Sequence, residues 1–199
     1  MSLLIKVCGI THAEAATAAV GAGADFLGFV FYPPSPRHMA LEQAAEIAEF
    51  VRDDVQIVAV FHHPDAKDVE RVIEVLRPGW VQSDVDDFDA MRLPDECRRL
   101  RVYRPATVSR LEAGGELALF EGPTSGLGRT VDWDLARDVA ARSRVMLAGG
   151  LTVGNVGQAV EAVSPAGVDV SSGVERAPGV KDPDMILDFV NAVRKAEET

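Results

Sequence analysis

Cysteine is scarce in this sequence, which excludes a fold held together by a framework of disulfides. The chain has two cysteines, Cys8 and Cys97, which could form one bridge, but nothing in their setting calls for it. Reduced cysteines are typical of cytosolic proteins. The first residues, MSLLIKVCGIT, place Lys6 inside an apolar stretch and lack a signal-peptide cleavage pattern. We therefore expect a cytoplasmic protein.

Positive charge is also in short supply. The chain has 20 Lys and Arg against 31 Asp and Glu, which gives a formal net charge of −11. A nucleic-acid partner is not expected, because no basic face is left over to meet phosphates. A small anionic ligand remains possible, since it needs only a local cluster of donors. No apolar run approaches the roughly 18–20 residues that span a bilayer, so we expect no membrane association.

Short apolar stretches with β-forming residues alternate with stretches of helical period along the whole chain. We expect strands at 3–7, 25–31, 56–61, 80–82, 100–104, 117–121, 145–148 and 167–170. We expect helices near 11–21, 41–52, 65–77, 87–92, 107–113, 132–142, 152–163 and 182–196. Nearly continuous apolar strands followed by helices indicate a parallel sheet that is covered on its outer face.

The number of strand–helix units decides between a closed barrel and an open sheet. Eight strand–helix units are enough to close a (β/α)₈ TIM barrel of the α/β class, although 199 residues lie at the small end of that fold. A doubly wound open sheet is the alternative, and it would normally use fewer units. No linker, low-complexity block or charge run divides the chain, so residues 1–199 are expected to form a single domain.

Three helix starts carry capping patterns. Thr11 and Glu14 form a T-x-x-E capping box. Asp132, in the segment VDW, is interpreted as an N-cap. Asp182 followed by Pro183 fits an N-cap and the first helical position.

Cys8 ends the first expected strand, where the functional residues of a (β/α)₈ barrel lie. Side chains alternate along a strand, so Cys8 shares a face with Lys6, while Ile5 and Val7 share the other. The apolar pair should face the helices, which turns Lys6 and Cys8 toward the barrel axis. An isolated cysteine is commonly a small buried hydrophobe. A nearby ammonium, however, favours the thiolate, so we single out Cys8 as a reactive thiol whose pKa Lys6 lowers.

Glu121 ends the sixth expected strand, in LALFEGPTSGLGRTVDW, and alternation places it inward with Leu117 and Leu119. It could be a carboxylate held by loop amides or by an arginine such as Arg129. It could instead be a carboxylic acid at the barrel mouth, with its pKa raised by apolar neighbours so that it can donate a proton. The sequence favours neither interpretation.

The last two strands end in turns rich in glycine and serine, within LAGGLTVGNV (147–156) and GVDVSSGVERAPGVKD (167–182). Glycine lets the backbone approach a ligand, and amide N–H groups at helix starts bind phosphate. The loops after strands 7 and 8 usually hold a substrate phosphate in this fold. Tight turns without a ligand would need the same glycines. Asp169, inward at the end of the eighth strand, could pair with Lys6 or hold a sugar hydroxyl.

Two further polar features follow strands 2 and 3. Arg37 lies in a proline-stiffened loop, FVFYPPSPRHM (29–39), and could present its guanidinium to a planar carboxylate or simply to solvent. His62 and His63 follow the third strand, but no other histidine or cysteine lies at metal-ligand spacing. The sequence therefore predicts no metal site.

Five segments together resemble phosphoribosylanthranilate isomerase of tryptophan biosynthesis: KVCGIT, GADFLGFVFYPPSPR, the VQ of the fourth strand, LAGGLTVGNV and GVDVSSGVERAPGVKD. The resemblance runs from Ile5 to Asp182. It implies an Amadori rearrangement without a cofactor, from N-(5-phosphoribosyl)anthranilate to 1-(2-carboxyphenylamino)-1-deoxyribulose 5-phosphate. In this reaction a general acid protonates the furanose ring oxygen, and a general base then removes the C2′ proton.

The same resemblance assigns residue roles. Cys8 matches the general base, and Glu121 stands where the family's general acid is usually an aspartate, one methylene shorter. The common VQLHG reads VQSDV here, so Gln82 remains, and Asp84 replaces a histidine and is the reserve candidate for the acid. Arg37 would face the anthranilate carboxylate. The phosphate would lie among Gly149, Gly150, Ser171, Ser172 and Gly173.

Two other functions stay open. A related phosphate-binding barrel could act on another sugar phosphate, as an epimerase or an indole-glycerol-phosphate-forming enzyme does, but the metal ligands or lysines and glutamates for those reactions are not seen. A degenerate barrel could bind a sugar phosphate for regulation. In each case the expected partner is a small molecule, and the chain would be a monomer or a homodimer.

Overall fold

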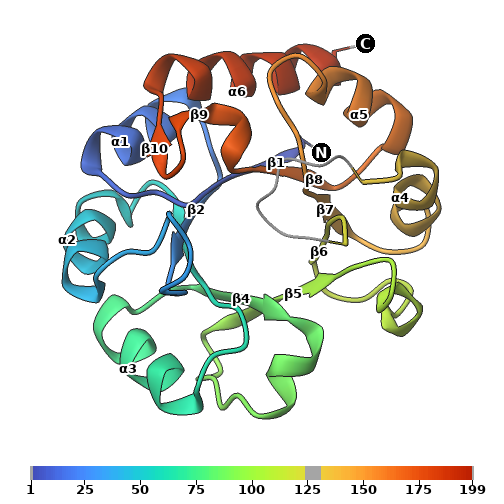
Figure 1. Cartoon of the computed structure of the whole chain (residues 1–199). Coiled ribbons are helices and arrows are strands. Elements are labelled where there is room, and N and C mark those ends of the chain that lie inside the picture. The colour runs from blue at the N-terminus through green and yellow to red at the C-terminus, as the bar shows by residue number, and fades with distance from the viewer. Residues whose placement is uncertain (1, 124–130, 199) are drawn as a thin grey trace.

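The computed structural model describes residues 2–123 and 131–198, and within them eight parallel strands close into a barrel (Figure 1). The strands are neighbours in chain order, and β1 also pairs in parallel with β8. They are β1 Leu4–Cys8, β2 Phe26–Val30, β3 Gln56–Val60, β4 Trp80–Asp84, β5 Arg98–Tyr103, β6 Ala118–Phe120, β7 Val145–Leu147 and β8 Gly167–Val170. The predicted (β/α)₈ barrel is confirmed, and the open sheet is excluded.

The α-helices form a ring outside the barrel (Figure 1). They are α1 Ala13–Ala22, α2 Leu41–Val51, α3 Ala66–Leu76, α4 Trp133–Ala140, α5 Val156–Val163 and α6 Pro183–Glu197. Within the described part of the chain, none of them is both long enough and apolar enough to cross a bilayer.

Two predicted helices are wrong. The segments expected as helices at 87–92 and 107–113 contain only short 3₁₀ helices, η1 Val85–Asp89 and η2 Val108–Arg110. Both segments are much shorter than the roughly 12–15 residues that sustain a helix without strong packing. Pro94 also follows the first segment closely and cannot continue an α-helix.

Alternation along the strands divides the apolar core into two layers. Ile5 and Val7 belong to the layer between the sheet and the helices, whereas Cys8 belongs to the layer inside the barrel. Lys6 is fully buried and points to the same side as Cys8, as predicted. The inner layer also contains Phe26, Val30, Val58, Val60, Trp80, Leu100, Val102, Leu117, Leu119, Met146 and Ala148.

Two of the three predicted helix caps are present in the structure. Asp182 accepts hydrogen bonds from the backbone N–H groups at the start of α6 at 3.0 and 3.2 Å, and Asp132 does the same for α4 at 2.9 and 3.2 Å. The capping box at Thr11 is wrong: His12 is the N-cap of α1, with no side-chain cap. The Thr11 hydroxyl instead donates to the carbonyl of Gly179 at 2.7 Å, in a distant part of the chain.

A two-stranded hairpin, β9 Glu175–Ala177 and β10 Val180–Lys181, follows β8 and was not expected from the sequence. Its turn packs against the loop after β2: a Cβ atom at Gly179, where φ is 79°, would lie 2.2 Å from the carbonyl oxygen of Pro36. Only glycine fits this backbone conformation and this close approach. The hairpin therefore places Glu175 next to Arg37.

Candidate active site

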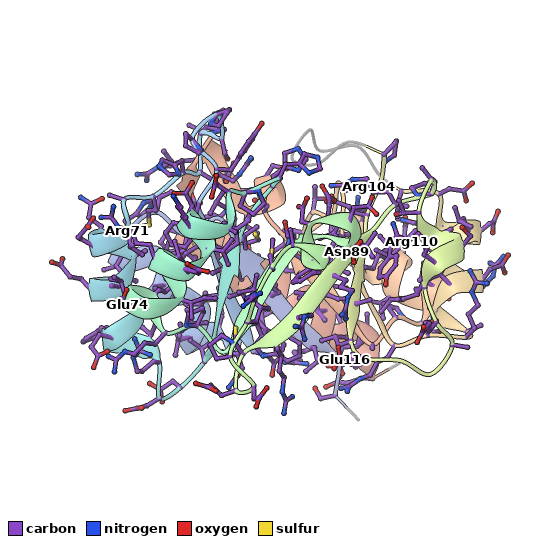
Figure 2. The ribbon with its side chains drawn as sticks, turned by 90° about the horizontal axis from the view of Figure 1, so that it is seen from below. Arg71, Glu74, Asp89, Arg104, Arg110 and Glu116 are labelled. Atoms are coloured by element: carbon purple, nitrogen blue, oxygen red, sulfur yellow. The ribbon has the colours of Figure 1, made fainter. Side chains whose placement is uncertain are left out.

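A cavity of about 1100 Å³ opens at the C-terminal ends of the strands. Figure 2 shows Arg104, which follows β5, at this end of the barrel, and Glu116, which precedes β6, at the opposite end. Lys6, Gly149, Gly150 and Gly173 are not part of the cavity lining. The other predicted site residues all line it: Cys8, Arg37, Gln82, Asp84, Glu121, Asp169, Ser171 and Ser172.

Lys6 and Asp169 form a buried ion pair. Register between β1 and β8 sets the two residues opposite each other, and Lys6 Nζ donates to Asp169 Oδ1 at 2.8 Å. This confirms the predicted pairing. Burial alone would lower the pKa of Lys6, but the Asp169 carboxylate and the Cys8 thiol raise it above its usual value, so the ammonium stays charged.

The Cys8 thiol is buried beside this pair, and its pKa lies above the usual value. Burial is the largest cause of the increase and the Asp169 charge adds to it, while Lys6 and Lys181 only partly offset it. Lys6 therefore lowers the pKa of Cys8, as predicted, but does not bring it below its usual value. Lys6 acts in the expected direction, but Asp169 at 2.8 Å neutralises much of its charge. The thiolate fraction of Cys8 consequently increases only as the pH becomes alkaline.

Arg104 bridges the two carboxylates that the sequence offered as general acids. Its Nη1 donates to Asp84 Oδ1, and its Nη2 donates to Glu121 Oε1 at 2.6 Å. The side chains of Asp84 and Glu121 are only 10% and 13% exposed. Glu121 is thus held by an arginine rather than by apolar neighbours alone; Arg129, suggested for this role, lies outside the described residues. Arg104 was not predicted as a site residue, although its place directly after β5 at the end of a barrel strand is a usable signal.

His62 contacts Asp84 from another side. Its Nδ1 lies 3.0 Å from Asp84 Oδ2, and its ring meets the ring of Tyr32 edge-on at 5.1 Å between centroids. Burial lowers the pKa of His62, and the neighbouring charges of His63 and Arg104 lower it further. His62, His63 and Asp84 bring three metal-ligand side chains together. Histidine and cysteine spacing alone did not predict this cluster, because its third member is a carboxylate from the neighbouring strand.

Arg37 is held by Glu175, which the sequence analysis did not single out. Its Nε and Nη2 donate to the two carboxylate oxygens of Glu175, each at 2.8 Å. Lys181 Nζ donates to the same carboxylate at 2.6 Å and to the Ser171 carbonyl at 3.0 Å. Burial alone would raise the pKa of Glu175, but these donors lower it below its usual value. Arg37 Nη1 forms no hydrogen bond to any residue that the structure describes.

The turns after β7 and β8 pack directly on each other. A Cβ atom at Gly173 would lie 1.9 Å from the Leu151 carbonyl oxygen, so glycine is required for this contact. The Asn155 side chain fixes the first turn, because it accepts from the Thr152 N–H at 2.8 Å and donates to the Gly150 carbonyl at 2.9 Å. The fold thus joins the two segments in which the sequence predicts a phosphate site.

Gln82 contributes an unused acceptor. Its side chain is buried, and its Oε1 has no hydrogen-bond partner among the described residues. Buried polar atoms are nearly always paired in folded proteins. Gln82 lines the cavity, although this oxygen is itself buried.

The closed barrel and the polar cavity at the C-terminal ends of its strands are those of a TIM-barrel enzyme. Residues 5–192 match the model of the family described as N-(5'phosphoribosyl)anthranilate (PRA) isomerase. The chain belongs to this family, which confirms the resemblance seen in the sequence.

Individual relatives agree with this assignment. The N-(5'-phosphoribosyl)anthranilate isomerase of Bradyrhizobium sp. BTAi1 is 40% identical over 216 residues, covering 100% of this chain and 98% of the relative. The crystal structure of TrpF from Jonesia denitrificans is similar with a TM-score of 0.83, 35% identity and 98% coverage of both chains. A phosphoribosyl anthranilate isomerase in complex with reduced 1-(o-carboxyphenylamino)-1-deoxyribulose 5-phosphate has a TM-score of 0.83 at 29% identity, covering 97% of this chain and 99% of that one.

Proposed function

We propose that this protein isomerises N-(5-phosphoribosyl)anthranilate to 1-(2-carboxyphenylamino)-1-deoxyribulose 5-phosphate, a step of tryptophan biosynthesis between anthranilate and tryptophan. The observation that carries the proposal is that Cys8, at the end of β1, and Glu121, directly after β6, line one cavity. The two strands lie apart in the closed barrel, so a thiol and a carboxylate can act on a sugar placed between them. Family membership supports the same reaction.

The reaction needs proton transfers but no external oxidant or reductant. A proton donated to the furanose ring oxygen opens the ring to a Schiff base. Removal of the C2′ proton then gives an enolamine, which becomes the ketone, so C2′ is oxidised while C1′ is reduced. In this proposal Glu121 donates the first proton and Cys8 takes the second, and positioned acids and bases of this kind contribute about 10²–10⁴-fold each. Asp84 is the second candidate for the acid, since Arg104 holds it beside Glu121.

The surrounding polar groups can bind the rest of the substrate. Arg37 Nη1 is the donor we assign to the anthranilate carboxylate, because Glu175 already occupies the other two nitrogens. Gln82, which lines the cavity, would contact the sugar. Lys6 is fully enclosed, so its role would be to position Asp169 and the thiol rather than to touch the substrate. The phosphate would bind where the turns after β7 and β8 meet, at Gly149, Gly150, Ser171, Ser172 and Gly173.

The decisive experiment follows the fluorescence of freshly prepared phosphoribosylanthranilate, coupled to the next enzyme of the pathway. We expect turnover by the wild type and a loss of about 10²–10⁴-fold in kcat for Cys8→Ala and for Glu121→Gln. Cys97→Ala is the matched control, because Cys97 is also a buried free cysteine but does not line the cavity. It should keep near wild-type kcat.

Other outcomes would revise or refute the proposal. If Asp84→Asn loses activity and Glu121→Gln does not, the acid is Asp84. If the wild type binds the substrate without consuming it, the protein is a binder and not an isomerase. Dependence on thiolate also predicts that kcat/KM increases with pH through the alkaline range, because the pKa of Cys8 is raised.

The proposal places the protein in the cytoplasm, which its two free cysteines support. It includes no nucleic-acid partner, in keeping with the net charge of −11. A monomer and a homodimer are both compatible with a site built from one chain, and sedimentation analysis distinguishes them.

A further inference from the structure

Two adjacent histidines and a carboxylate converge at the rim of the barrel, and the proposed isomerisation uses neither histidine. His62 and His63 follow β3, and Asp84 ends β4, the strand paired with β3 in parallel. One ligand atom from each of the three residues lies within 4.8 Å of the others. Imidazole and carboxylate groups are the ligands that Zn²⁺ and similar ions take in proteins.

Two of the three separations between ligand atoms are close to those around a tetrahedral ion. Asp84 Oδ2 lies 3.0 Å from His62 Nδ1 and 3.8 Å from His63 Nε2. With metal–ligand bonds of about 2.0–2.1 Å, the ligands of a tetrahedral zinc ion are about 3.3 Å apart. The two observed distances lie on either side of that value. All three ligand atoms lie within 4.8 Å of one another, so an ion could replace the hydrogen-bonded proton between these groups once the side chains adjust.

The backbone of His63 is arranged to bring the second imidazole to the same carboxylate. Neighbouring residues in extended chain point to opposite sides, but His63 has a φ of 49°, which an L-residue other than glycine rarely adopts. As a result the rings of His62 and His63 lie 4.2 Å apart between centroids. Strained backbone of this kind is concentrated at functional sites.

Asp87 supplies the outer partner that metal-binding histidines usually have. Its Oδ1 lies 2.8 Å from His63 Nδ1, which leaves Nε2 of that ring directed toward Asp84. The Asp87 carboxylate also accepts from the His63 backbone N–H at 3.1 Å and from the Ser83 hydroxyl at 2.5 Å, so its position is fixed. A carboxylate bound to the far nitrogen of a histidine selects the tautomer and orients the ring for a metal.

Charge and access are also compatible with a cation. Arg104 binds Asp84 Oδ1 and leaves Oδ2 for the imidazoles, and the Asp87 carboxylate beside His63 adds negative charge. The side chains of His62 and His63 are 41% and 66% exposed, so an ion can enter from solvent and a water can complete its coordination. We propose that His62, His63 and Asp84 form a binding site for a divalent transition-metal ion such as Zn²⁺, with Asp87 orienting His63.

The test is a titration of the full chain with Zn²⁺ in competition with a chromophoric chelator. We expect one zinc ion per chain, and binding at least 30-fold weaker in His62→Asn and in His63→Asn. Asparagine suits position 63 because it tolerates a positive φ. Asp87→Asn should weaken binding by about 10–100-fold, as loss of an outer partner does. His38→Asn, at an exposed histidine outside the cluster, should bind zinc like the wild type.

The proposal is overturned if the wild type does not compete for zinc, or if the His62→Asn/His63→Asn double variant binds zinc as tightly as the wild type. Loss of binding in Cys8→Ser would also overturn it, because it would place the ion on the thiol. Circular dichroism of each variant establishes that it is folded. Binding of Co²⁺ with the visible absorption of a four-coordinate ion would support the site independently. The titration uses the metal alone, so its result does not depend on whether the protein is an isomerase.

Discussion

Replacing Lys6 with methionine should destabilise the barrel strongly. Methionine fills a similar volume, but it leaves the Asp169 carboxylate, 8% exposed, without the ammonium that now lies 2.8 Å away. Removing one member of a buried ion pair costs about 3–5 kcal/mol. That loss is a large part of the roughly 5–15 kcal/mol by which domains are usually stable. We expect Lys6→Met to lower the free energy of unfolding by about 3–5 kcal/mol, measured by urea unfolding.

Two further variants test whether the unpaired Asp169 carboxylate causes the loss of stability in Lys6→Met. Lys67→Met makes the same replacement at an exposed position on α3 and should change stability by no more than about 0.5 kcal/mol. Lys6→Met combined with Asp169→Leu replaces the whole pair with apolar groups and should return to within about 1–2 kcal/mol of the wild type. A loss below about 1 kcal/mol in Lys6→Met, or a double variant less stable than Lys6→Met alone, would refute the buried-pair explanation.

Three other predictions concern a cap, a thiol and a turn. Asp132→Ala removes the N-cap of α4 and should cost about 1 kcal/mol, which calorimetry would record as a decrease of about 2–4 °C in Tm. Burial raises the pKa of Cys97 to about 11, so the folded state keeps a proton that the unfolded state loses from about pH 9. The stability that Cys97 contributes is therefore complete below about pH 9 and is lost as the pH increases through 11, and urea midpoints should decrease less over this range in Cys97→Ala. Gly173→Ala would place a Cβ 1.9 Å from the Leu151 carbonyl oxygen and should raise KM at least 10-fold in the fluorescence assay. Gly154→Ala should not, because its Cβ would lie 3.8 Å from the Thr152 hydroxyl oxygen. Equal KM values in the two variants would argue against a phosphate site at this junction.

Local patterns in the sequence were sufficient for most of the fold. The eight strands follow from apolar stretches separated by helical segments, because only a closed or layered parallel sheet buries so many strands of this kind. The caps at Asp132 and Asp182 are confirmed because a capping carboxylate acts on N–H groups two and three residues away. The capping box predicted at Thr11 is wrong because the Thr11 hydroxyl donates to the carbonyl of Gly179, 168 residues further along the chain. The helices predicted at 87–92 and 107–113 are wrong because helical spacing of apolar residues does not show how much packing a short segment receives.

The sequence by itself determined the barrel and which face of each strand points inward, because alternation and apolar period are properties of neighbouring residues. It therefore identified Cys8, Lys6 and Asp169 as inward residues at strand ends. Only the tertiary structure decided how these groups interact: the pairing of Arg37 with Glu175, 138 residues away, and the bridge from Arg104 to both candidate acids. The same is true of the Cys8 pKa, since its direction depends on burial and on Asp169, which reaches the thiol only when β8 closes the barrel against β1.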